Sequence, residues 1–189
     1  MRLQAERNAI KAAVFHRVPW LLLLLFLGLL VSGAVGIFEG VIARFPVLVA
    51  FQSLILGMAG NAATQSLALS VRGLATDSTD GTLHLWREVA ITLFCGALLG
   101  ALSFLLVSVS LCTLDTYTLP FSLRVGGCAG MAMCLSMALS GLAGAGIPLV
   151  LCRLGADPAV ASGPLITTAV DLLSVLLYYG LAMLLLRGI

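Results

Sequence analysis

Charged side chains are scarce in this sequence. Of its 189 residues only 10% are Asp, Glu, Lys or Arg, whereas 61% are hydrophobic. A soluble domain carries roughly 25% charged residues, so this composition excludes a soluble fold. The formal net charge of +2 is too small to indicate a nucleic-acid partner. We therefore predict a multi-pass integral protein of the cell membrane, with the lipid bilayer as its immediate partner.

Residues that support enzyme chemistry are equally scarce. The chain has two His and five Cys, and it contains neither a C-x-x-C pair nor a G-x-S-x-G motif. No His and Cys residues occur at the spacing of zinc ligands, which disfavours a zinc-like site. The scattered cysteines are interpreted as small apolar packing residues. An aspartyl hydrolase needs two central carboxylates, and each chain offers one. We therefore expect no enzyme activity and no bound cofactor.

Five apolar segments are long enough to cross a bilayer, for which a helix needs roughly 20 residues. They are predicted at residues 18–38, 46–71, 89–111, 122–150 and 160–186. The predicted fold class is thus all-α, a polytopic five-helix transmembrane domain over residues 18–189. Residues 1–17 form a short basic cytoplasmic leader, predicted as an amphipathic helix with disorder as the alternative. The run after it is too long for a signal peptide and lacks an Ala-x-Ala cleavage signature.

Basic residues set the expected orientation. If the N-terminus is inside, the inner segments hold Arg2, Arg7, Lys11, Arg17, Arg72, Arg87 and Arg153, and the outer segments hold only Arg44, Arg124 and Arg187. This excess predicts an N-terminus inside and a C-terminus outside. The connector from Gly73 to Leu85 becomes a cytoplasmic loop in which His84 is solvated. Four aromatic residues near the span ends are expected to anchor the membrane interfaces: Trp20, Trp86, Tyr178 and Tyr179.

Asp171 lies in the middle of the last apolar segment. A carboxylate at the centre of a membrane helix costs about 2.5–3.5 kcal/mol on insertion scales, so it normally marks an ion or substrate pathway. Helical stepping places small and polar residues on its face, among them Gly163 and Thr167. The opposite face is apolar and is expected to meet lipid: Ile166, Val170, Leu173, Leu177 and Leu184.

The second span carries a matching small and polar stripe, where only apolar residues would be expected. Its run from Gly57 to Ser66 reads Gly-Met-Ala-Gly-Asn-Ala-Ala-Thr-Gln-Ser. At a rise of about 1.5 Å per residue, this run and Asp171 reach comparable depths in antiparallel helices. The two stripes together form the predicted metal-binding pathway: Asp171, Thr167, Gly163, Gly57, Gly60, Asn61, Thr64 and Ala68. The alternative is that the small residues only pack helices and Asp171 bonds to a neighbouring helix.

The oxygen-rich stripes favour a hard cation. Mg²⁺ keeps much of its water and binds through one or two carboxylates. A single central Asp per chain suits this ion if a two-fold axis brings two chains together. We therefore expect Mg²⁺ to be a transported ion rather than a cofactor.

Several longer motifs resemble those of the MgtE family of magnesium channels. They are Arg17-Val-Pro-Trp-Leu, Phe38-Glu39, the run from Gly57 to Ser66, Val71-Arg-Gly-Leu-Ala75, Arg87-Glu88 and the run from Asp157 to Asp171. The resemblance implies five helices per subunit, a homodimer, and an ion path between subunits lined by the second and fifth helices. The family's pore carboxylate falls on Asp171, and its neighbouring pore positions fall on Gly163, Thr167, Gly57, Gly60, Thr64 and Ala68.

The chain also departs from the family pattern. Typical members carry a cytosolic N-terminal domain and CBS modules that sense Mg²⁺, and about 17 residues before the first span leave room for neither. Ala63 stands where glycine is common, and Gly163 where some members have asparagine. Selectivity among Mg²⁺, Mn²⁺, Co²⁺ and Ca²⁺ stays open, and a separately encoded regulator is an expected partner. Two rival functions remain: an H⁺- or Na⁺-coupled cation exchanger that uses Asp171, and a non-transporting membrane subunit that binds a partner.

Overall fold

The computed structural model describes residues 2–75, 81–113, 117–155 and 163–187, and their regular structure is entirely helical. This confirms the all-α fold class. The helices are α1 (Arg2–Ile37), α2 (Glu39–Arg44), α3 (Val47–Ala75), α4 (Gly81–Thr113), α5 (Leu119–Arg153) and α6 (Gly163–Leu185).

Five of these helices are long and apolar enough to cross a membrane. The qualifying stretches are Ile10–Ile37, Val47–Leu74, Gly81–Thr113, Leu119–Arg153 and Gly163–Leu185. They coincide in order and position with the five predicted spans, so the chain is a multi-pass integral membrane protein. The short α2 was not predicted, and it lies between the first and second spans.

The predicted loop from Gly73 to Leu85 is wrong at both ends. Residues 73–75 complete α3, and α4 begins at Gly81, eight residues before the predicted start of the third span. His84 is therefore a helical residue, and it is only partly exposed. The hydrocarbon core takes up only about 20 residues of a helix, and a helix can continue beyond it into water. The change from apolar to polar residues therefore does not mark where a membrane helix ends. The predicted start of the fifth span, at residue 160, lies outside the described residues.

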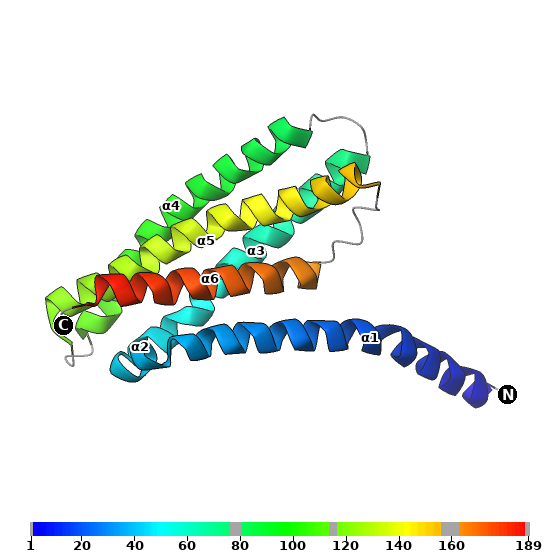
Figure 1. Ribbon diagram of the computed structural model, residues 1–189, viewed down its shortest axis with the longest axis horizontal. Helices are drawn as coiled ribbons and strands as arrows, with labels where there is room; N and C mark the ends of the chain where they lie inside the picture. Colours follow the sequence, from blue (N-terminus) through cyan, green and yellow to red (C-terminus); the bar gives the residue numbers. More distant parts are fainter. Residues whose placement is uncertain (1, 76–80, 114–116, 156–162, 188–189) are drawn as a thin grey trace.

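α1 joins the basic leader and the first span in one helix. It runs from Arg2 to Ile37 with Pro19 in its interior. Proline removes one backbone hydrogen bond and its ring clashes with the preceding turn, which bends a helix. Figure 1 shows α1 bent towards its N-terminal end and lying along α6 at the edge of the bundle.

α4 and α5 lie side by side and pack through glycine (Figure 1). A Cβ atom added to Gly100 would lie 2.5 Å from the carbonyl oxygen of Gly130, and one added to Gly130 would lie 2.6 Å from that of Gly100. The two backbones thus touch directly, as small residues allow in membrane helix pairs. α5 also packs against α3 and α6, so it is the central helix of the bundle.

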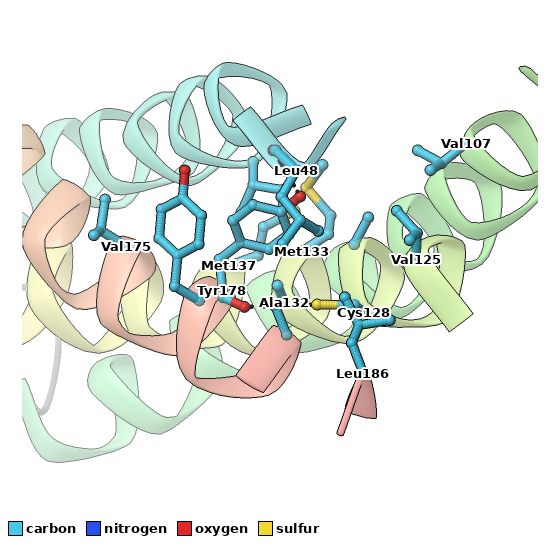
Figure 2. Packing of buried hydrophobic residues seen from close by; sticks show 14 of the residues in the cluster. Leu48, Val107, Val125, Cys128, Ala132, Met133, Met137, Val175, Tyr178 and Leu186 are labelled. Atoms are coloured by element: carbon cyan, nitrogen blue, oxygen red, sulfur yellow. Dashed lines mark hydrogen bonds between the residues drawn. The ribbon is translucent and has the colours of Figure 1, made fainter. Parts of the chain in front are cut away.

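The main apolar cluster joins α3, α5 and α6 around two tyrosines (Figure 2). Tyr178 and Tyr179 are both 0% exposed, so the prediction that they anchor the membrane interface is wrong. The Tyr178 hydroxyl donates to the Leu48 carbonyl at 2.9 Å, and the Tyr179 hydroxyl bonds to Oε1 of Gln52. A buried tyrosine needs such a partner, and α3 supplies both. The dashed line in Figure 2 joins the Cys128 thiol to the Tyr178 carbonyl.

Removal of the Tyr178 hydroxyl is expected to destabilise the fold. Tyr178→Phe keeps the ring but removes the hydrogen bond to the Leu48 carbonyl, which costs about 0.5–1.5 kcal/mol. Thermal unfolding in detergent should show a lower midpoint for this variant. Tyr117→Phe is the control, because Tyr117 stacks on Phe121 and is only partly buried. Equal midpoints for Tyr178→Phe and the wild type would contradict the assigned hydrogen bond.

Candidate ion pathway between α3 and α6

A groove of about 410 Å³ lies where α3 and α6 pack together. Its lining consists of Gln52, Ser53, Leu56, Gly57, Gly60, Asn61, Thr64, Thr167 and Asp171. Six of these are predicted pathway residues: Gly57, Gly60, Asn61, Thr64, Thr167 and Asp171. The structure therefore brings most of the two predicted stripes onto one surface.

Asp171 supplies the negative charge of this groove. It is neither fully buried nor fully exposed, and it sits one helical turn from Thr167 on α6. Gly60 forms the facing wall, where an added Cβ would lie 3.5 Å from Cγ2 of Thr167. Gly57 has no atom within 4 Å of an added Cβ. The glycines thus keep the groove open beside the carboxylate.

Two threonine hydroxyls present oxygen lone pairs beside Asp171. Thr64 Oγ1 donates to the carbonyls of Gly60 and Asn61, at 3.2 and 2.9 Å, and Thr167 Oγ1 donates to that of Pro164 at 3.0 Å. A hydroxyl that donates its proton to the backbone keeps its acceptor lone pairs for another group. The groove therefore combines one carboxylate with neutral oxygen acceptors, which suits a hydrated hard cation.

Two predicted pathway residues lie at the edge of this surface. A Cβ on Gly163 would lie 3.6 Å from Cγ2 of Thr64, so Gly163 borders the groove without lining it. Ala68 is exposed one turn beyond Thr64 and is not part of the lining. The lining also contains Ser53, which the same stepping reaches one turn before Gly57. Sequence analysis missed Gln52 and Leu56, although stepping back by four residues from Gly60 would have reached Leu56 and then Gln52.

The expected lipid-facing side of α6 is buried at two of its five residues, and a third, Leu177, is partly exposed. Ile166 and Val170 are 0% exposed and pack in a second cluster with Ala59, Ala63 and Leu67 of α3. The prediction of lipid contact is wrong for these two residues, because α3 and α5 both pack against α6. Leu173 and Leu184 are 41% and 59% exposed, as a lipid-facing position requires.

Within the described parts of the chain, no three His, Cys, Asp or Glu side chains gather as a metal-binding group. Of the cysteines, Cys128 is buried as predicted for a packing residue, whereas Cys95 and Cys152 are exposed.

The comparison with protein families matches this same region. A family model, MgtE, described as a divalent cation transporter, covers residues 52–181, from the first groove residue of α3 to beyond Asp171. The chain belongs to the MgtE family. The resemblance drawn from the sequence motifs is thereby confirmed.

Three MgtE relatives match nearly the whole chain. The magnesium transporter MgtE of Enterococcus faecalis is 42% identical over 188 residues, which is 97% of this chain and 39% of the relative. Those of Bacillus subtilis and Thermus thermophilus are each 36% identical, over 90% and 92% of this chain. They are covered over 36% and 37% of their own lengths. The chain thus spans less than two-fifths of each relative.

Proposed function

We propose that this MgtE-family chain forms a homodimeric channel that passes hydrated divalent cations, Mg²⁺ first, along the groove between α3 and α6. The observation that carries the proposal is the position of Asp171, which faces the glycines and hydroxyls of α3 across an open groove in a membrane domain. The relatives' names, magnesium transporter MgtE, support Mg²⁺ as the leading ion. Mn²⁺, Co²⁺ and Ca²⁺ are the other candidates.

In this mechanism two copies of the groove face each other and enclose the ion. Each copy contributes one carboxylate, so the pair matches the two charges of Mg²⁺. Asp171 attracts the ion chiefly through its bound water, and the oxygens of Thr64 and Thr167 accept hydrogen bonds from that water. The membrane potential drives the ion inwards, with about 2.3 kcal/mol per elementary charge per 100 mV.

The excess of basic residues on one side supports an N-terminus inside and a C-terminus outside. A separately encoded regulator is the proposed partner that controls the pore. The five-helix domain itself supplies the path and the ion site.

A coupled exchanger is the second candidate, because a partly buried carboxylate can alternate between a proton or Na⁺ and a metal ion. Uptake of Mg²⁺ into proteoliposomes that contain only the purified chain separates the possibilities. A channel shows uptake that follows an imposed voltage with Mg²⁺ as the sole gradient. An exchanger requires a proton or Na⁺ gradient at fixed voltage. Folded protein with no uptake under either regime contradicts transport and favours a non-transporting subunit.

A further inference from the structure

The face of α3 that points away from the groove carries a buried polar ladder. Ser66 and Ser70 are each 1% exposed, and Glu88 on α4 is 5% exposed. At 3.6 residues per turn, Ser66 lies on roughly the opposite side of α3 from Gly60 and Thr64. The ladder is therefore distinct from the groove, and it begins along α3 just after the last lining residue, Thr64.

The ladder links α3 to α4 at two levels. Ser66 Oγ donates to Oε2 of Glu88 at 3.0 Å. One turn further along, Ser70 Oγ lies 2.9 Å from Nε2 of His84. The four-residue spacing in both helices makes these links consecutive rungs between antiparallel helices.

The two serine hydroxyls make separate contacts. Ser70 Oγ donates to the Ser66 carbonyl at 2.7 Å and lies within hydrogen-bond distance of Nε2 of His84, where the tautomer of the ring decides which atom is the donor. The Ser66 hydroxyl donates to Glu88.

α5 holds the same stretch of α3 by direct packing. A Cβ on Gly144 would lie 2.5 Å from the Ala63 carbonyl oxygen and 2.9 Å from Cβ of Ser66. Two helices therefore hold the stretch of α3 from Ala63 to Ser70. α5 contacts its backbone at Gly144, and α4 is joined to it by the ladder. Hydrogen bonds specify rotation and axial position more sharply than apolar packing, because their geometry is directional.

We propose that Glu88 and His84 are positioning residues for the ion pathway. They fix the rotation of α3 and thereby the positions of Asn61 and Thr64 in the groove. A carboxylate in so apolar a site is costly unless hydrogen-bonded, and its bond to Ser66 connects it to the pathway helix. The expected effect on Mg²⁺ flux rests on the proposed function. The expected effect on the position of α3 does not, and it can be measured without transport.

The structural test uses Thr64→Cys in a background whose natural cysteines are replaced by Ala or Ser. The rate at which Cys at position 64 reacts with a water-soluble thiol reagent is measured in nanodiscs. Glu88→Leu should change this rate by about fivefold, because a lost hydrogen bond of average strength corresponds to that factor. Glu88→Gln, whose amide oxygen still accepts from Ser66, should leave the rate near that of the parent. Gly57→Cys lies two turns away, before the stretch that the ladder holds, and its rate should change less than that of Thr64→Cys when Glu88→Leu is introduced.

The transport test compares Mg²⁺ flux per folded protein for the same substitutions at position 88. Glu88→Leu is expected to lower flux by about tenfold and Glu88→Gln by much less. Unfolding midpoints are measured in parallel, and Ser66→Ala supplies a second variant if Glu88→Leu fails to fold. An unchanged labelling rate in folded Glu88→Leu and Ser66→Ala protein would overturn the positioning role. A changed rate without any wild-type flux would support the ladder and refute the channel.

Discussion

Asp171→Asn is expected to lower Mg²⁺ flux by at least about 30-fold. At 4 Å a unit charge pair attracts by about 1 kcal/mol even in bulk water, hence about 2 kcal/mol for a divalent ion. That energy corresponds to roughly 30-fold in rate, and the partly enclosed groove strengthens the attraction. Two subunits would lose the charge together. Initial rates of Mg²⁺ uptake, normalised to folded protein in the liposomes, measure the effect.

Two further variants show whether charge at this position is responsible. Asp171→Glu keeps the charge on a longer side chain and should retain more flux than Asp171→Asn. Glu39→Gln removes the same charge from an exposed residue of α2 that does not line the groove, and should have little effect. Flux in Asp171→Asn within a few-fold of the wild type would remove Asp171 from the ion site.

Gly130→Ala is expected to have the largest effect on folding. Its new Cβ would lie 2.6 Å from the carbonyl oxygen of Gly100 and 3.1 Å from Cβ of Phe104, and the first of these atoms belongs to backbone. α4 and α5 would have to separate, and overpacking of this kind costs about 1–3 kcal/mol. The unfolding midpoint and the yield of monodisperse protein should both fall. Gly100→Ala should lower both quantities as well, because its new Cβ would lie 2.5 Å from the carbonyl oxygen of Gly130.

Gly127→Ala is the matched control for these two variants. Gly127 lies on the same helix, less than one turn from Gly130, but no atom lies within 4 Å of its added Cβ. Since alanine also favours the helix over glycine, Gly127→Ala should fold at least as well as the wild type. A Gly130→Ala protein as stable as Gly127→Ala would show that the two backbones do not meet there.

The sequence was sufficient for the spans and for most of the groove. Length and hydropathy mark membrane helices because the bilayer thickness is nearly constant. Helical periodicity places Gly57, Gly60 and Thr64 on one face, and Asp171 makes the face of α6 chemically distinct. Those regularities are local, so no knowledge of the packing was needed.

Errors arose where the neighbouring helix decides the outcome. The apolar surface of a membrane helix can meet lipid or protein equally well, so Ile166 and Val170 were predicted to be exposed and are buried. Tyr178 and Tyr179 were predicted to lie at the membrane interface, but both are buried because α3 provides hydrogen-bond partners for their hydroxyls. Glu88 was predicted to precede the third span and is instead a buried hydrogen-bond acceptor within α4. Periodicity shows which residues share a face, and only tertiary packing shows what covers it.

Thiol modification of Asn61→Cys tests the pathway most directly. Asn61 is exposed and lines the groove, whereas Leu69 is exposed on the same helix and does not line it. In a background without other cysteines, a bulky cationic thiol reagent should stop Mg²⁺ flux through Asn61→Cys and leave Leu69→Cys active. Mg²⁺ should slow the reaction at position 61 alone. Complete modification of Asn61→Cys with undiminished flux would contradict an ion path along α3 and α6.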